Sequence, residues 1–486
     1  MNAHSLSIGL SIALLAALSG STRAAPDSIL ADQNINDQQP ELELVHGCWG
    51  DEHGNLSGGQ FFLPMDQEAL EIVEAVKQAN RGSIDNRVDL VIVGDGYQAN
   101  EMGQFHNDAD SIIASFFTYE PFKSYEPYFR FSQIEVISNE SGVDNDTAQN
   151  VSRDTALDMS YWCNGTERLL CVNVGKAFTA ASAAPDIDQI IAISNSSKYG
   201  GAGYSSNNLG TAAGQNSAAA EIAIHEMGHS LGDLADEYTY GGPTTYTGGE
   251  LTPVDVSIYD QAEQISRGTK WYRWMDASMT GFDNPVRTYE GGNYSVNGVF
   301  RPSPNSMMRS LGRNFNLVSA EKLLKEIYRE VNPIDDGTPN GTVVNHDDSL
   351  WVTPMQPLNH DLQVLWYLDD ALIVTAVNQH TLNLDSLIPM DGQFHTVRVD
   401  VVDPTPWVIN EVVRNNFLSE SRTYGVNACS LTADLSDDGS LNFFDVSAFL
   451  SAYNAQDPSA DFTGDGSFNF FDVSAFLVAF NSSECQ

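Results

Sequence analysis

Residues 225–238, HEMGHSLGDLADEY, hold the side chains best suited to do chemistry. His225 and His229 are four residues apart, so a helix places both imidazoles on one face, one turn apart, where they can share a metal ion. Glu226 lies beside that face, in reach of a water on the metal rather than of the metal itself. The spacing therefore predicts a metal site on a helix, with Glu226 as the catalytic general base.

The neighbouring residues favour the helix that this site needs. Residues 218–224, AAAEIAI, are good helix formers, and Asn216 and Ser217 are candidates for the N-cap. Gly232 is a natural place for the helix to stop and the chain to turn back. The alternative, two ordinary solvated or capped histidines, is disfavoured by this glycine, the carboxylates after it and the export signal described below.

A third ligand is expected shortly after the helix, because catalytic zinc usually takes three protein ligands and leaves a fourth position for water. The metzincin spacing would put that ligand at Ala235, which cannot bind metal. Asp236 is one residue further on, and Glu237 is next to it. Either carboxylate can complete the site, and the other would then orient a ligand imidazole from outside the first shell of ligands.

A methionine-containing turn is predicted at residues 301–309, RPSPNSMMR. In metzincin-like folds such a turn forms an apolar floor beneath the metal ligands. Met308 is the better candidate for this role and Met307 the second. Without further context, a methionine in a loop more often serves ordinary packing.

Strands and helices that could position the site alternate over residues 83–335. Apolar runs at 88–93 and 189–194 predict buried strands that enter glycine-containing turns. Helical periodicity covers residues 107–117, 218–231 and 320–331. These elements predict an α/β or α+β layer structure, with residues 25–82, helical at 66–79, as an N-terminal segment packed on it.

The chain changes character after residue 335. Residues 334–342 are rich in Asp, Gly, Pro and Asn and predict a linker. Short alternating runs at 362–367 and 396–401 then lie between turn residues. This pattern predicts an immunoglobulin-like β-sandwich over residues 343–424, without the disulfide typical of that fold.

An internal repeat marks the C-terminal part of the chain. The nine residues 442–450, NFFDVSAFL, recur unchanged 27 residues later at 469–477. Each copy follows an acidic loop with a central glycine, Gly439 or Gly466, and leads into a predicted helix, at 446–453 and 473–480. The oxygen ligands expected for Ca²⁺ are Asp434, Ser436, Asp438, Ser440, Asn442 and Asp445 in the first loop and Asp461, Thr463, Asp465, Ser467, Asn469 and Asp472 in the second.

The last loop position is Asp rather than the usual Glu, and in this the tail resembles dockerin modules over residues 429–486. That resemblance implies a small α-helical module with two structural Ca²⁺ sites. It leaves two interpretations open. The module binds a cohesin-like or cell-surface partner, or it is a calcium-stabilised cap without a partner.

Charge and targeting signals restrict where the protein works. With 23 Lys and Arg against 65 Asp and Glu, the net charge of −42 argues against nucleic acid and anionic membranes as partners. Residues 1–24 resemble a signal peptide, with an apolar run at 8–18 and small residues before a cut after Ala24. No other segment is apolar enough to span a bilayer. We expect a secreted protein, which can be associated with a cell surface.

Export permits disulfides. Cys163 and Cys171 could close a small loop, and Cys429 and Cys485 could join the ends of the last segment, which leaves Cys48 over. Buried free thiols are the alternative.

We assign no role to the remaining histidines, which are expected on the surface or as satisfied core residues: His46, His53, His106, His346, His360, His380 and His395.

Several of these stretches, in this order, resemble the immunoglobulin A metallopeptidase family of secreted zinc endopeptidases. The resemblance covers residues 85–332 and rests on DLVIVGDGY at 89–97, EPF at 120–122, SGVD at 141–144, YGG at 199–201, the run from His225 to Tyr238, and NSMM at 305–308. It implies a metzincin-like zinc peptidase domain, with Asp236 preferred over Glu237 as the third ligand and Met308 in the methionine turn. The module after the catalytic domain in that family also resembles residues 343–424. The resemblance does not specify a substrate.

The expected function is therefore zinc-dependent hydrolysis of peptide bonds in proteins, with Glu226 moving the proton. We expect residues 195–203, just before the active helix, to supply the edge strand that aligns a substrate. The alternative is a catalytically weak surface or matrix-binding protein that acts through its β-sandwich and calcium module.

Overall fold

The described part of the chain begins with a strand at residue 41. In this computed structural model the described residues are 41–50, 56–65, 67–79, 86–239, 244–385, 387–388, 393–428, 432–436, 438 and 441–482. The expected signal peptide at 1–24 lies outside them, as do Cys429, Ser440 and Cys485.

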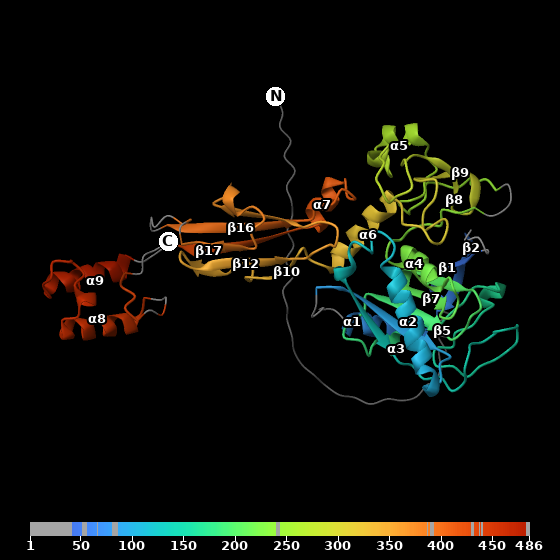
Figure 1. Cartoon of the computed structure of the whole chain (residues 1–486), viewed down its shortest axis with the longest axis horizontal. Helices are drawn as coiled ribbons and strands as arrows, with labels where there is room; N and C mark the ends of the chain where they lie inside the picture. The colour runs from blue at the N-terminus through green and yellow to red at the C-terminus, as the bar shows by residue number, and fades with distance from the viewer. Residues whose placement is uncertain are drawn as a thin grey trace, which may run out of the picture. The chain divides into compact units, whose positions relative to one another are not determined.

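A seven-stranded mixed sheet supports the metal-site motif (Figure 1). Its central parallel strands are buried along their length, which explains their apolar sequences, because a parallel sheet is covered on both faces. The strand order is β2 (Leu56–Met65), β1 (Glu41–Gly50), β6 (Gly201–Tyr204), β7 (Leu209–Ala213), β5 (Gln189–Ser194), β3 (Val88–Asp95) and β4 (Phe129–Ile134). Strands β7, β5, β3 and β4 are parallel, and β6, β1 and β2 each run antiparallel to their neighbour.

Helices cover both faces of this sheet, because successive side chains of a strand point to opposite sides. Leu90 and Ile92 of β3 belong to the core shared with α2 (Met102–Phe116), α4 (Ala219–Ser230) and α6 (Leu317–Glu330). Val91 and Val93 belong to the core shared with α1 (Gln67–Ala79) and α3 (Val174–Ala181). The mixed α/β layers expected from the sequence are present.

The N-terminal segment forms part of the sheet and does not merely pack on it. Ten residue pairs join β1 and β2 into a hairpin, and β1 continues the sheet through Val45 opposite Tyr204 and His46 opposite Gly203. The glycines in both strands made this region resemble turns in the sequence. They fit a hairpin because a Cβ at Gly58 would lie 2.0 Å from the carbonyl oxygen of Gly47 and 2.2 Å from the hydroxyl oxygen of Tyr238.

Two further sheets follow within the chain. One has the order β10 (Ile334–Gly337), β12 (Ser349–Pro354), β15 (Thr381–Asn383). The other has the order β11 (Val343–Asn345), β17 (Ser419–Asn427), β16 (Phe394–Val402), β13 (Gln363–Leu368), β14 (Ala371–Leu372). Apolar residues of both, such as Val352 and Trp366, share one core.

The prediction of a linker at residues 334–342 is wrong for its first four residues, because residues 334–337 form strand β10. Its composition is that of a turn, but Ile334 is buried and pairs with Pro354 of β12. Burial of one apolar residue and ladder pairing decide the structure here, against the local preference of Asp and Gly for turns.

A buried carboxylate joins this β-rich region to the helices of the large sheet. Asp403 Oδ2 accepts hydrogen bonds from the hydroxyls of Tyr125 and Tyr328, at 2.6 and 2.7 Å, and Asp403 Oδ1 lies 2.6 Å from His360 Nε2. The pKa of Asp403 is lowered, because these partners outweigh the burial that would raise it. Hydrogen bonds to Asp403 thus bring together three residues that are far apart in the sequence, Tyr125, Tyr328 and His360.

The C-terminal repeat forms α8 (Phe443–Ala455) and α9 (Phe470–Ser482). The rings of Phe449 and Phe476, one from each copy, stack with centroids 4.1 Å apart in a small core of their own. The remaining elements are β8 (Tyr289–Gly292), β9 (Ser295–Arg301), α5 (Gln261–Arg267) and α7 (Glu411–Phe417). Among the described residues no helix has the length and apolar character to cross a membrane.

Candidate metal centre

Helix α4 places His225 and His229 side by side, as their spacing predicts. Both imidazoles are buried. His225 Nδ1 lies 3.0 Å from the carbonyl oxygen of Met307, and His229 Nδ1 lies 2.7 Å from that of Leu234. A carbonyl can only accept, so each Nδ1 carries the proton and each Nε2 is left as an acceptor or metal ligand.

Asp236 faces the two Nε2 atoms. Its Oδ1 lies 3.1 Å from His225 Nε2 and 3.3 Å from His229 Nε2. Burial raises the pKa of Asp236, but positive charge and hydrogen bonding at His229, His225 and His46 would hold that pKa well below its usual range, and a metal ion on the Nε2 atoms would supply this charge in place of protons. Two imidazoles with fixed Nδ1 protons and one ionised carboxylate converge here, and this set of donors fits a zinc ion.

The turn after α4 brings Asp236 back to the helix. The helix ends at Ser230, and the left-handed residue is Asp233, at φ 48°, rather than the expected Gly232. Gly232 is required for space, because a Cβ there would lie 2.7 Å from the carbonyl oxygen of Gly228. At the other end the N-cap is Ala218, and Asn216 accepts from the backbone N–H of Ala218 without being the cap itself.

Glu226 is completely buried and lies against β6. A Cβ at Gly203 would come within 2.5 Å of Glu226 Oε2, and one at Gly210 within 3.4 Å of Glu226 Cβ. The absence of side chains at Gly203 on β6 and at Gly210 on β7 (Leu209–Ala213) thus leaves room for Glu226 in its present position. The expected substrate-aligning segment at residues 195–203 includes the first three residues of β6, so that strand lies next to the proposed base.

Both predicted methionines lie at the site. Met308 packs beneath α4, where a Cβ at Gly228 would be 2.4 Å from Met308 Sδ. Met307 contributes the carbonyl that holds His225. The backbone carbonyl of Met308 accepts from the N–H of Glu237 at 2.8 Å, which ties this turn to the segment that carries Asp236.

Glu237 turns away from the histidines. Its carboxylate accepts from Ser306 Oγ at 2.7 Å and from Asn316 Nδ2 at 2.6 Å. Burial raises the pKa of Glu237 to about 7, although these hydrogen bonds oppose the shift. The expectation that this second carboxylate orients a ligand imidazole is wrong here, because backbone carbonyls hold both rings.

His46 of β1 also lies at the site, and sequence reasoning missed it. Its ring stacks on that of His229 with centroids 4.0 Å apart, and His46 Nδ1 lies 3.7 Å from Asp236 Oδ2. Ligand atoms of His46, His229 and Asp236 are all within 4.8 Å of one another. No local motif marks His46, because pairing of β1 with β6 creates the contact.

Tyr294 is the other residue that the sequence did not identify. Its hydroxyl donates to Asp236 Oδ2, the oxygen on the side away from the two α4 histidines. The residue lies between β8 and β9, and the backbone N–H of the preceding Asn293 donates to the Asp236 carbonyl at 2.7 Å. This segment therefore orients Asp236.

The two acidic loops of the repeat have matching hydrogen bonds. Asp445 accepts from the N–H groups of Ser436 and Asn442, at 3.0 and 2.7 Å. Asp472 accepts from the equivalent N–H groups of Thr463 and Asn469, at 3.1 and 2.8 Å. In the first loop, carboxylate oxygens of Asp434, Asp438 and Asp445 lie within 4.8 Å of one another, so this group could hold a metal ion. The other predicted loop ligands within the described residues are Asp461, Asp465 and Ser467.

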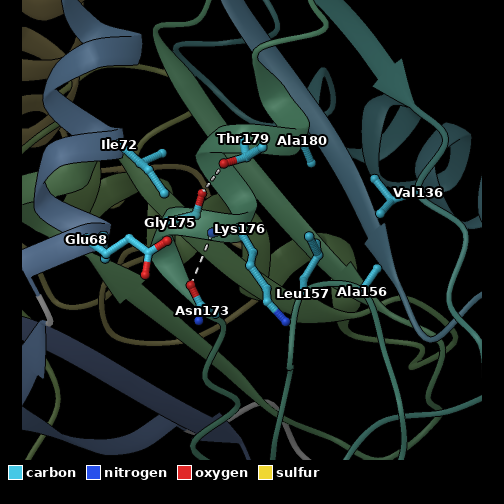
Figure 2. A pocket seen from close by; sticks show the side chains of 11 residues that line it. Glu68, Ile72, Val136, Ala156, Leu157, Asn173, Gly175, Lys176, Thr179 and Ala180 are labelled. Carbon is cyan, nitrogen blue, oxygen red and sulfur yellow. Dashed lines mark hydrogen bonds between the residues drawn. The ribbon is translucent and has the colours of Figure 1, made fainter.

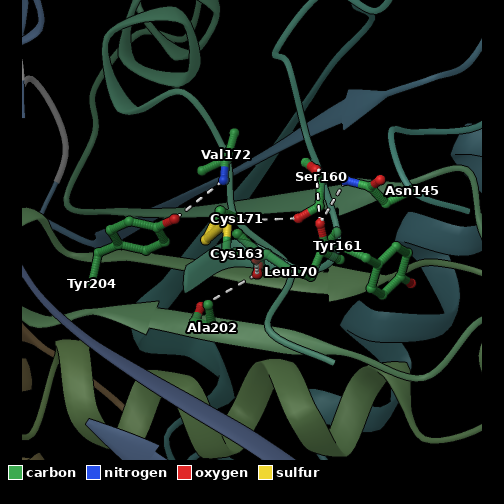
Figure 3. The surroundings of a disulfide bond; sticks show 10 residues. Asn145, Ser160, Tyr161, Cys163, Leu170, Cys171, Val172, Ala202 and Tyr204 are labelled. Atoms are coloured by element: carbon green, nitrogen blue, oxygen red, sulfur yellow. Dashed lines mark hydrogen bonds between the residues drawn. A yellow bond between two sulfur atoms is a disulfide. The ribbon is translucent and has the colours of Figure 1, made fainter. Parts of the chain in front are cut away.

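A disulfide joins Cys163 and Cys171, whose Cα atoms are 6.1 Å apart (Figure 3). The loop that it closes contains Leu169, which pairs with Gly201 at the start of β6. Cys171 itself pairs with Ser160. The disulfide therefore braces a loop that contacts the strand beside Glu226.

A cavity of about 370 Å³ lies on the opposite face of the sheet, between α1 and α3 (Figure 2). Glu68 and Lys176 are its charged lining residues, and none of the predicted site residues contributes to it. The cavity is therefore separate from the metal centre.

Residues 76–282 match the family model described as IgA Peptidase M64. The match contains His225, Glu226, His229 and Asp236 and ends before the methionine turn. A search of curated proteins finds no match to the chain.

Proposed function

Because the chain belongs, through residues 76–282, to the IgA Peptidase M64 family, we propose that it is a zinc-dependent endopeptidase. One observation carries the proposal: His225 Nε2 and His229 Nε2 both face Asp236 Oδ1, while each Nδ1 is fixed on a carbonyl. A peptidase family implies a protein or peptide substrate. The fold around the site is then a metzincin-like domain, with Met308 as the methionine of its turn.

Zinc, when bound by His225, His229 and Asp236, supplies a Lewis acid that polarises the scissile carbonyl and lowers the pKa of water. Glu226 is placed to take a proton from the attacking water and to deliver it to the leaving amine. Met307 and Leu234 keep the imidazoles in the tautomer that binds metal through Nε2. The Tyr294 hydroxyl holds Asp236 in place.

We also propose that the protein acts outside the cell. The signal peptide predicted at residues 1–24 supports export, and the disulfide between Cys163 and Cys171 suits an oxidising compartment. The excess of acidic residues disfavours binding to nucleic acid or to anionic lipid.

The regions after the peptidase domain are proposed to be an immunoglobulin-like sandwich and a dockerin-like calcium module. One observation favours a partner for this module over a cap without one. Each copy of the repeat exposes two adjacent phenylalanines, Phe443 and Phe444 in one and Phe470 and Phe471 in the other, between 66% and 76% accessible. Repeated, exposed aromatic pairs suit a cohesin-like or cell-surface partner.

The same phenylalanine pairs support the second candidate function, a weakly catalytic protein that binds a surface or matrix. Zinc content and hydrolysis distinguish the two. We expect the purified full chain to bind one zinc ion per molecule and, once active, to digest casein or gelatin in a reaction stopped by a zinc chelator.

Glu226→Gln should keep its zinc and lose hydrolysis by at least about 100-fold, because general base catalysis contributes about 10²–10⁴-fold. A chain without zinc, or a Glu226→Gln variant as active as the wild type, would contradict the proposed function.

A further inference from the structure

The metal centre is closed to a substrate. His225, Glu226, His229 and Asp236 are each at most 1% exposed. A peptide bond must come within about 3–3.5 Å of the attacking group to react. Some part of the chain therefore covers the site in this state.

His46 covers two of the proposed metal ligands, His229 and Asp236. Its ring stacks on His229, and its Nδ1 lies 3.7 Å from Asp236 Oδ2. The imidazole is itself buried, at 5% exposed. Because its ligand atom is within 4.8 Å of those of His229 and Asp236, His46 can bind the same ion. A catalytic zinc keeps one position open, whereas four protein ligands give a closed, structural type of site.

Strand β1 also occupies the backbone edge next to Glu226. It pairs antiparallel with β6, with His46 opposite Gly203, and Gly203 is the residue that Glu226 lies against. Without the β1–β2 hairpin, β6 would be an edge strand of the sheet beyond Gly201, which is paired with Leu169. Extended peptides commonly bind by adding a strand to such an edge, so β1 lies where a substrate would pair.

The hairpin is joined to the sheet by few backbone pairs. Ten pairs hold β1 to β2, whereas two hold β1 to β6. Side chains strengthen the contact: Glu43 accepts from the N–H of Ser206 at 3.2 Å and from Asn207 Nδ2 at 2.9 Å. A unit that pairs mostly with itself can leave without breaking the parallel strands that carry the rest of the fold.

We propose that the β1–β2 hairpin is an autoinhibitory segment, in which β1 occupies the substrate-binding edge of β6 and His46 is a further metal ligand. This inference rests on the proposed function. Hydrolysis of one peptide bond between β2 and β3, with water adding across that bond, separates the hairpin from the catalytic residues and opens both the metal and the edge of β6.

The first test measures access to the metal rather than turnover. Co²⁺ is bound to the full chain in place of zinc, and its visible absorption is followed as acetohydroxamate is added. We expect no spectral shift in the wild type and a clear shift in His46→Ala, which should also bind Co²⁺ about tenfold more weakly. His106→Ala is the matched control, because His106 is a half-exposed histidine bound to Gln133 and Glu135.

An equal shift in the wild type and in His46→Ala would overturn the inference and leave the proposed function intact. A wild-type chain that binds neither Co²⁺ nor zinc would contradict the proposed function itself. Thermal melting of each variant verifies that it is folded.

The second test does not depend on a substitution at the metal centre. A site for a sequence-specific protease is introduced at residue 66, between β2 and α1, and the full chain is cut there. We expect the hairpin to separate in size-exclusion chromatography under mild denaturant, the cobalt spectrum to become sensitive to acetohydroxamate, and casein hydrolysis to rise at least about tenfold. Release of the hairpin with an unchanged spectrum would overturn the inference.

Discussion

Met308 fills the space that a side chain at position 228 would need. A Cβ built on Gly228 would lie 2.4 Å from Met308 Sδ, and the neighbouring Met307 carbonyl lies 3.0 Å from His225 Nδ1. The methionine turn thus contacts α4 between its two histidines and also fixes the tautomer of one. Packing and ligand orientation at this centre are coupled.

Gly228→Ala should therefore destabilise the fold by about 1–3 kcal/mol, the usual cost of overpacking a filled core, and should weaken zinc binding. Gly103→Ala is the matched control, because Gly103 lies in α2 and nothing is within 4 Å of its Cβ position. That change should be neutral or stabilise by up to about 1 kcal/mol. Chemical denaturation measures both, and equal effects of the two substitutions would contradict the role given to Met308.

The third ligand can be identified by two neighbouring substitutions. Asp236→Asn removes the charge that faces both Nε2 atoms and should weaken zinc binding by at least about 100-fold. Glu237→Gln changes a carboxylate held by Ser306 and Asn316 and should leave zinc bound. Competition with a chromophoric chelator measures both affinities. Loss of zinc in Glu237→Gln alone would reverse the assignment.

The local part of the site could be predicted from the sequence. The spacing of four residues predicted that His225 and His229 lie on the same face of a helix, because helix geometry alone determines that contact. The choice between Asp236 and Glu237 depended on resemblance, because the turn is set by the left-handed Asp233 and by space at Gly232, and neither is evident from composition. The strands β3 and β5 were predictable from their apolar runs, because a parallel strand buried on both faces is rich in apolar residues.

Contacts made through sheet pairing could not be predicted in this way. His46 reaches the site only because β1 pairs with β6, and the glycines of its hairpin are typical of turns rather than of a strand. β10 was missed for a related reason, since Asp and Gly dominate residues 334–337 and only Ile334 is buried. Pairing partners far apart in the chain determine both cases.

Asp188 should make stability depend on pH. Burial raises its pKa to about 7, with Glu330 and Asp186 nearby, although the Asp89 N–H donates to it at 2.7 Å. A carboxyl whose folded pKa lies above its unfolded value of 3.8 contributes stability below that value, and loses it as pH rises from about 4 through about 7.

Asp188→Asn keeps an acceptor for the Asp89 N–H and removes the titration. The variant should be more stable than the wild type by about 1–3 kcal/mol at pH 8 and should lose that advantage near pH 4. Thermal unfolding across this range measures the difference. A constant difference at all pH values would contradict the assignment to this carboxyl.

Asp403 should hold the β-rich region to the helices of the large sheet. Asp403→Ala leaves the hydroxyls of Tyr125 and Tyr328 without their acceptor in a buried position, and we expect a loss of about 2–4 kcal/mol. Asp400→Ala, on β16 just before Asp403, is the control, because its partners Arg398 and Ser421 lie nearer the surface. Denaturation that shows equal losses for both would exclude a special role for Asp403.

Calcium should stabilise the C-terminal repeat through Asp445. Burial raises the pKa of this residue, but the N–H groups of Asn442 and Ser436 outweigh it and bring the pKa to about 2. The carboxylate is therefore ionised and ready to bind Ca²⁺ at neutral pH.

Calcium titration of the full chain, followed by calorimetry and thermal melting, should show calcium binding. Asp445→Ala should weaken this binding by at least about tenfold, because EF-hand affinity depends on the number of charged ligands. Asp457→Ala, which removes only the cap on Ser459 outside the loop, should leave binding unchanged, and calcium binding that survives Asp445→Ala undiminished would refute the predicted ligand set.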